Sequence, residues 1–245
     1  MPQENFLESS MPFLNHLEEL RWRLLKSFLT IVIATVVAFY FSEQIMQFII
    51  APLGDRKLYF TEVTGSFYAF LKLSLLTGVL AASPVVFYQL WAFVSPGLYS
   101  KEKMQILPLV FISTLLFLVG AGFCYYTVLP YSLKFLIGFS GDLLSPLITV
   151  GSFISFAGML MLAFGICFQL PVAAYFLGRI GLINPTILRK GRRYAVILIL
   201  IFAAILTPSP DVATQLMLAV PLYLLYEVSI IIVRFTGKNR HNSSK

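Results

Sequence analysis

The residues best suited to recognise another molecule are a few carboxylates that stand among basic residues. Glu18 and Glu19 lie in the segment H-L-E-E-L-R, residues 16–21, just before the first long apolar run. Glu102 lies in S-P-G-L-Y-S-K-E-K, residues 95–103, between two later apolar runs. A carboxylate accepts two parallel hydrogen bonds from an arginine guanidinium, a geometry that lysine cannot match. These acids therefore either form local ion pairs with neighbouring bases or receive a cationic partner.

Amide and hydroxyl side chains inside the apolar runs are the second group of candidates. Gln169 lies two residues before Pro171, and it either bonds a carbonyl that the proline leaves free or faces a polar cavity and contacts a substrate segment. Gln215 has Thr207 and Thr214 near it. These three side chains either hydrogen-bond another membrane helix or are solvated where a membrane span begins.

Residue patterns typical of catalysis or metal binding are missing from the sequence. Cys124 and Cys167 both lie inside apolar runs, and His16 and His241 lie near opposite ends of the chain. There is no G-x-S-x-G, no H-E-x-x-H and no phosphate-binding loop. We therefore expect no enzyme activity, no cofactor and no metal site.

The elements that must position these side chains are apolar helices. The chain is 58% hydrophobic and 12% charged, whereas a soluble domain has about 25% charged residues. A helix needs about 20 apolar residues to cross a membrane. Six apolar runs are found, at 24–41, 66–93, 105–126, 152–178, 194–206 and 212–233. The sequence predicts an all-α integral membrane protein with six transmembrane helices, forming one domain over 1–235 with a flexible tail at 236–245.

Basic residues indicate how these helices are oriented. Fourteen of the eighteen Lys and Arg residues lie in four segments that alternate with the apolar runs: residues 1–26, 95–104, 179–193 and 234–245. Short loops rich in Lys and Arg stay in the cytoplasm. Both termini are therefore predicted to be cytoplasmic. The net charge of +7 is explained by this topology, so we expect no nucleic-acid partner. The sequence before the first run has no cleavable signal or transit peptide, which favours a bacterial protein.

The last two runs are short, and several runs contain proline. Residues 194–206 would form a helix of roughly 20 Å, about 10 Å less than the hydrocarbon layer of a bilayer. The sixth run is interrupted by Glu227. Two short neighbouring helices either thin the bilayer locally, or their flanking side chains extend to the membrane surface and leave the bilayer unchanged. Prolines at 84, 108, 171 and 221 remove backbone donors and bend helices, which predicts a cupped bundle.

Three features are expected on the outer side. Residues 43–50 and 130–138 mix apolar and polar residues at helical spacing, so each is expected to lie flat at the interface or to cap the bundle. Lys72, inside the second run, is expected to extend its ammonium outward along the helix.

Taken together, these motifs resemble the TatC family, the multispanning core of the twin-arginine protein translocase. The resemblance covers residues 11–235. It is carried by the motifs at 16–21 and 95–103, by F-Q-L-P at 168–171, by T-P-S-P-D at 207–211, and by the glutamine and L-L-Y-E that follow. It implies a glove-shaped receptor in the bacterial inner membrane. Such a receptor binds the S-R-R-x-F-L-K signal peptides of folded proteins and assembles with the single-span proteins TatA and TatB. It also implies a larger complex with several copies of the chain, in which the proton-motive force drives protein export.

The resemblance assigns roles to individual residues. Glu102 matches the glutamate that binds the arginine pair, and Glu19 matches a second contributing glutamate. Arg21 matches a position linked to function. Many members have glutamate where this chain has Gln169, so a hydrogen-bonding role is expected here rather than a charge-based one. Pro52 resembles the family's proline after the first outer amphipathic stretch.

The other matches lie around the last turn. Gln215 matches the docking site for TatB and TatA, and Thr207 and Thr214 are further candidates for that site. The turn ending at Asp211 has one residue more than the usual T-P-P-D. The candidate structural positions are Pro52, Pro171 and Asp211.

Two other functions are compatible with a membrane bundle. A small-solute transporter or channel would need a continuous polar lining, and charged residues in the middle of the apolar runs are nearly absent. A membrane enzyme would need a catalytic constellation, which the motifs do not supply. The receptor hypothesis is therefore preferred.

Overall fold

The described part of the chain folds into helices, as the sequence predicts. The computed structural model describes residues 4–54, 56, 58–60, 62–94, 106–138, 147–206 and 212–242. In chain order the α-helices are α1 (Glu4–Tyr40), α2 (Ser42–Ile50), α3 (Gly65–Val94), α4 (Ile106–Phe123), α5 (Leu129–Gly138), α6 (Val150–Cys167), α7 (Leu170–Ile180), α8 (Pro185–Leu206) and α9 (Val212–Asn242). A 3₁₀ turn, η1 (Ala51–Leu53), follows α2, and a π-helical turn, η4 (Cys124–Val128), joins α4 to α5.

Long apolar helices make this chain a multi-pass membrane protein. Five helical stretches of the described residues are long and apolar enough to cross a membrane: Asn15–Tyr40, Gly65–Val94, Ile106–Gly138, Val150–Ile180 and Gln215–Phe235. Their surfaces stay apolar where they are exposed. Leu24, Phe28 and Val36 of α1, for example, are 60%, 66% and 67% exposed. A continuous apolar surface of this kind is stable against lipid rather than water.

The expected fifth span corresponds to the second half of α8. The helix begins at Pro185, in the basic segment before the apolar residues 194–206. Pro185 opens the helix because a proline in the first turn costs no hydrogen bond. The apolar part of α8 is as short as expected, although the helix has 22 residues. Whether α8 makes a sixth crossing, and on which side the termini lie, stay predictions.

Glu227 interrupts the apolar run of the sixth span but does not end the helix. Helix α9 continues through it for 31 residues in all. Arg192 Nη2 of α8 lies 2.6 Å from Glu227 Oε2, and the Tyr223 hydroxyl donates to Glu227 Oε1 at 2.9 Å. Because both carboxylate oxygens have donors, the charge does not break the helix.

The third apolar run also extends further than the sequence suggests. Helix α5 follows α4 through the π-helical turn Cys124–Val128, so that helical structure runs on to Gly138. Pro130 has no N–H to bond the carbonyl of residue 126, and a π-turn redistributes the hydrogen bonds at that point. The segment 130–138 is therefore a continuation of the third helix. Segment 43–50 is helical as α2.

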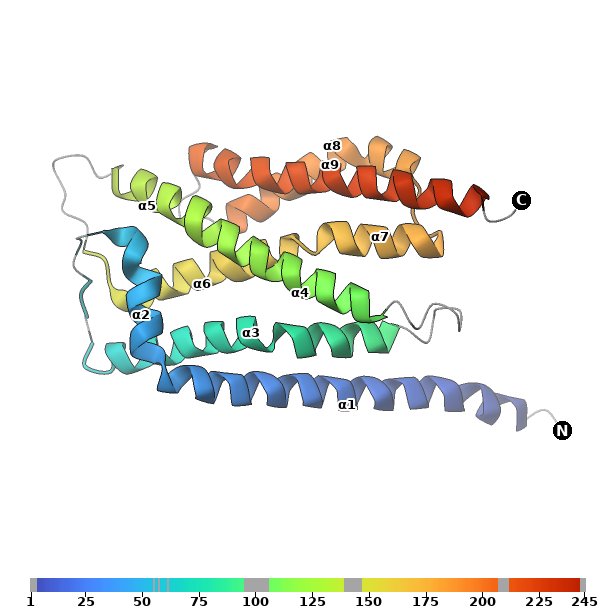
Figure 1. Ribbon diagram of the computed structural model, residues 1–245, viewed down its shortest axis with the longest axis horizontal. Helices are drawn as coiled ribbons and strands as arrows, with labels where there is room; N and C mark the ends of the chain where they lie inside the picture. The colour runs from blue at the N-terminus through green and yellow to red at the C-terminus, as the bar shows by residue number, and fades with distance from the viewer. Residues whose placement is uncertain are drawn as a thin grey trace. The chain divides into compact units, whose positions relative to one another are not determined.

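The structure groups the chain into two compact sets of residues. The first comprises Met1–Phe41 and Ser74–Thr114. In it α1 runs beside α3 (Figure 1), and Gly78 makes their close approach possible. A Cβ at position 78 would lie 2.7 Å from the backbone nitrogen of Thr35. Trp91 Nε1 donates to Ser113 Oγ at 2.8 Å, which ties α3 to α4.

The second set comprises Ser42–Leu73 and Leu115–Lys245. Its core is centred on α6, where Leu160 and Phe164 are fully buried. Helix α9 packs against both α7 and α8, and Figure 1 shows the three helices side by side. The Tyr125 hydroxyl donates to the Phe48 carbonyl, and the two rings stack at 4.6 Å, which fixes α2 to the π-turn. The expected single domain over 1–235 and the flexible tail stay predictions.

The fourth apolar run is divided into two helices. Helix α6 ends at Cys167 and α7 begins at Leu170, with Pro171 in its first turn. Proline is tolerated there because the first N–H groups of a helix have no partner within it. Gly181 ends α7 with a φ of 84°, a left-handed conformation that favours glycine. Among the prolines expected to bend helices, Pro108 instead lies in the first turn of α4.

Candidate functional site

An arginine–carboxylate pair lies on α1 at the residue that the sequence analysis singles out. Arg23 follows Glu19 by four residues, which places both side chains on one face of the helix. Arg23 Nε lies 2.9 Å and Nη2 lies 2.5 Å from Glu19 Oε1. The other carboxylate oxygen, Oε2, lies 3.7 Å from His16 Nδ1. The carboxylate of Glu19 therefore already holds a guanidinium, one supplied by its own helix.

Helix α3 supports this pair from the other side. Arg23 Nη1 donates to Gln89 Oε1 at 3.3 Å. The rings of His16 and Phe93 stack with centroids 4.4 Å apart and planes at 11°. Helix α3 ends one residue later, at Val94. Glu102, the other predicted arginine-binding residue, lies beyond that end and outside the described residues.

The exposure of the pair decides how firmly it is held. The Glu19 side chain is 34% exposed and that of Arg23 is 24% exposed. Ion pairs that water reaches stabilise a protein by about 0–1 kcal/mol. A competing guanidinium can therefore displace Arg23 at small cost. The local ion pair and the receptor site, which the sequence leaves as alternatives, are compatible at Glu19.

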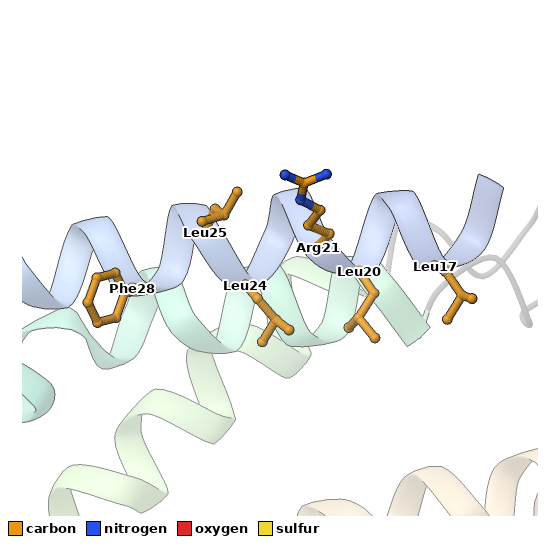
Figure 2. A pocket seen from close by; sticks show the side chains of 6 residues that line it. All are labelled: Leu17, Leu20, Arg21, Leu24, Leu25 and Phe28. Carbon is orange, nitrogen blue, oxygen red and sulfur yellow. The ribbon is translucent and has the colours of Figure 1, made fainter. Parts of the chain in front are cut away.

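Arg21 lies beside an apolar groove on α1. The groove has a volume of about 390 Å³ and is lined by Leu17, Leu20, Arg21, Leu24, Leu25 and Phe28. Figure 2 shows Arg21 and Leu25 on one side of the helix and Leu17, Leu20 and Leu24 on the other. Among the described residues, no carboxylate lies within 4.0 Å of the Arg21 guanidinium. The groove combines a cation with an apolar surface, and it lies on another face of α1 than Glu19, because residues two apart do not share a helix face.

Gln169 lies at the break between α6 and α7, in the second set of residues. Its backbone carbonyl accepts a hydrogen bond from Ala173 N at 2.9 Å. Its side chain is half-buried and does not cap α7. Pro171, two residues later, makes this break. Gln169 therefore lies at a helix junction, while its hydrogen bond to a carbonyl that Pro171 leaves free and its contact with substrate both stay predictions.

Gln215 joins α9 to α8. Its Nε2 donates to the backbone carbonyl of Leu200 at 2.8 Å. Within the part of the chain that the structure describes, no donor hydrogen-bonds the side-chain oxygen of Gln215. Thr214 lies in the first turn of α9, and the structure does not describe its side chain. Thr207 and Asp211 lie outside the described residues.

Sequence reasoning missed three residues that shape these sites. Arg23 could have been found, because a glutamate followed four residues later by arginine is a recognised helix pair. Gln89 and the carbonyl of Leu200 could not, because they meet their partners across distant parts of the chain. Pro52, the remaining candidate, lies in η1 directly after α2, at the position that the sequence analysis expects.

Comparison with known proteins gives one consistent family. A family model described as Sec-independent protein translocase protein (TatC) matches residues 15–221. A TatC protein of Desulforapulum autotrophicum is 43% identical over 243 residues, which are 97% of this chain and 90% of the relative. A TatC protein of Aquifex aeolicus is 39% identical over 241 residues, which are 96% of this chain and 100% of the relative.

Solved structures agree with the relatives. A crystal structure of the twin-arginine translocase receptor TatC is 40% identical, with a TM-score of 0.81, and the match covers 90% of this chain and 99% of the other. A second crystal structure of that receptor, in the detergent DDM, has a TM-score of 0.82 at 40% identity, covering 89% and 99%. The similarity therefore extends over nearly the whole fold.

Proposed function

The chain belongs to the TatC family of Sec-independent protein translocase proteins, and on this premise we propose that it is the signal-peptide receptor of a twin-arginine translocase. The observation that carries this proposal is the similarity to solved twin-arginine translocase receptors over 90% of the chain. As a component of a translocase, it acts by binding rather than by catalysis.

The cargo's arginine pair is bound by Glu102 and Glu19. Support comes from Glu19, whose carboxylate receives two guanidinium nitrogens of Arg23. The incoming arginine takes the place of Arg23, because a partly exposed pair exchanges at a cost of about 1 kcal/mol or less. Arg21 and the apolar groove beside it, on another face of α1, offer a separate contact surface for the apolar residues of the signal peptide.

Two amides serve the later steps. Gln169, half-buried at the break between α6 and α7, contacts the signal peptide where its apolar part passes. Gln215, with Thr207 and Thr214 near it, docks the single-span partners TatA and TatB. Support comes from the side-chain oxygen of Gln215, which accepts no hydrogen bond from the described residues while Nε2 donates to Leu200.

The chain lies in the bacterial inner membrane with both termini in the cytoplasm and six crossing helices in a cupped bundle. The support for this orientation is the four basic segments. Several copies join TatA and TatB in a complex that the proton-motive force drives. The short apolar half of α8 favours a locally thin bilayer where the partners assemble.

Cross-linking of a twin-arginine signal peptide to the full chain in a lipid nanodisc tests the receptor proposal. A photoreactive group is placed next to the arginine pair, and the wild type is compared with Glu102→Ala and with Lys26→Ala as the control. The expected result is loss of the cross-link in E102A alone. Full cross-linking of E102A would refute the role of Glu102.

Reconstitution into liposomes separates a receptor from a small-solute transporter. Liposomes that contain only this chain are loaded with a panel of radiolabelled ions and sugars. If the chain is a receptor that needs partners, these liposomes should release none of the solutes faster than protein-free liposomes loaded with the same solutes. Selective release of one solute would favour the transporter instead.

A further inference from the structure

A cavity of about 350 Å³ lies where α3 and α6 begin, in the second set of residues. Its lining includes Tyr59, Phe60, Glu62, Tyr68, Lys72 and Thr149. A short parallel bridge holds the segment before α3 against the start of α6. Tyr59 N donates to Ile148 O at 3.0 Å, and Val150 N donates to Tyr59 O at 3.1 Å. The cavity is thus built by backbone hydrogen bonds between distant segments.

Lys72 brings a cation into this cavity from within an apolar helix. It lies seven residues after Gly65, the first residue of α3, or roughly 10 Å along the axis. Side chains of a helix lean toward its N-terminus, so the ammonium reaches back to the cavity. Lys72 Nζ donates to Ser155 Oγ at 3.0 Å, and Ser155 Oγ donates to Gly151 O at 2.8 Å. Ser155 therefore fixes the ammonium in place.

The charge of Lys72 calls for an anionic ligand. An ammonium has three donors, and the bond to Ser155 uses one. Among the described residues, no carboxylate lies within 4.0 Å of Lys72. An unpaired charge at this depth of a membrane helix is costly. Phosphate oxygens would satisfy the two remaining donors, and the lining residues Tyr59 and Tyr68 each carry a further hydroxyl donor.

Glu62 adds a negative charge to the cavity, so the ligand must also carry a positive group. Glu62 lines the same cavity as Lys72, so its negative charge would repel a purely anionic ligand. A zwitterion that carries a phosphate and a primary ammonium complements both residues.

The surroundings of the cavity favour a lipid over a soluble phosphate ester. Leu71 of α3 is 42% exposed, and Met159 of α6, one turn beyond Ser155, is 48% exposed. Acyl chains would cover these apolar side chains. Tyr59 and Tyr68 are 46% and 54% exposed, as expected of aromatic residues at the level of lipid headgroups.

We propose that this cavity binds the phosphoethanolamine headgroup of a membrane phospholipid, with its phosphate on Lys72 and its ammonium on Glu62. The proposal is independent of signal-peptide binding, because it concerns another part of the molecule. With the topology proposed above, the lipid belongs to the outer leaflet.

Native mass spectrometry of the purified full chain tests this site. Detergent-solubilised protein is titrated with dioleoyl-phosphatidylethanolamine and, separately, with dioleoyl-phosphatidylglycerol. We expect the wild type to retain phosphatidylethanolamine in preference. Lys72→Gln should bind it at least about tenfold more weakly, because charge-assisted hydrogen bonds are lost, whereas Lys72→Arg should keep binding. Glu62→Gln should remove the preference for phosphatidylethanolamine over phosphatidylglycerol.

Three results would overturn the proposal. They are unchanged retention by K72Q, equal retention of both lipids by the wild type, and displacement of the lipid by an equal concentration of free phosphoethanolamine. If K72Q does not fold, Ser155→Ala carries the same test. It removes the hydrogen bond that positions the ammonium, and retention of the lipid should fall several-fold.

Discussion

Replacing Arg23 by glutamine removes the guanidinium that occupies Glu19 and keeps a polar but shorter, neutral side chain. In the wild type, a cargo arginine must first displace Arg23 from the carboxylate. We therefore expect Arg23→Gln to bind a twin-arginine peptide more tightly. The opposite expectation holds if Arg23 serves only to orient Glu19, so the sign of the change distinguishes the two roles.

The size of the effect follows from the exposure of the pair. With side chains that are 34% and 24% exposed, the interaction lies within the range of water-accessible ion pairs. Helix pairs four residues apart contribute about 0.3–0.5 kcal/mol, and the most favourable exposed pairs contribute about 1 kcal/mol. Removing the competitor should thus tighten peptide binding about two- to fivefold.

The assay is a fluorescence-anisotropy titration of a labelled twin-arginine peptide against the chain in nanodiscs. Lys26→Gln is the matched control, because it removes one positive charge one turn further along α1. If R23Q weakens binding, or if K26Q tightens binding as much as R23Q, then Arg23 does not compete with the cargo.

Three other variants test how the fold holds its sites. Gly78→Ala should lower the free energy of unfolding by about 1–3 kcal/mol, because its Cβ would lie 2.7 Å from a backbone atom of α1, whereas Gly122→Ala, with nothing within 4 Å, should not lower it. Thermal unfolding in detergent measures both. Gln215→Ala loses a 2.8 Å hydrogen bond, so it should cost about 1 kcal/mol and reduce cross-linking to a single-span partner; full cross-linking would contradict that role. Glu227→Gln should cost about 1 kcal/mol or less and leave peptide affinity unchanged, as the same titration would show.

The cores of the membrane helices were predictable from the sequence because apolar runs of sufficient length have few alternatives to crossing a membrane. The ends of the helices were not predictable, because they depend on partners elsewhere in the chain. Helix α9 passes Glu227 since Arg192 and Tyr223 satisfy its carboxylate. Helical structure passes Pro130 through a π-turn. A hydropathy pattern contains neither of these compensations.

The candidate site was predictable in its residue types and less so in its contacts. Glu19 stands out in the sequence, and the spacing to Arg23 indicates their pairing. The link from Arg23 to Gln89 spans 66 residues and depends on how α1 packs against α3. The pairing of Tyr59 with Thr149 joins two short segments that lack strand periodicity, so no local pattern indicates it.

The most direct test of the receptor proposal compares two peptides that differ only in the arginine pair. A twin-arginine peptide and its twin-lysine counterpart are titrated against the wild-type chain in nanodiscs. Because lysine cannot reproduce the bidentate contact with a carboxylate, the twin-lysine peptide should bind at least about tenfold more weakly. Equal affinity for the two peptides would contradict recognition of the arginine pair by Glu102 and Glu19.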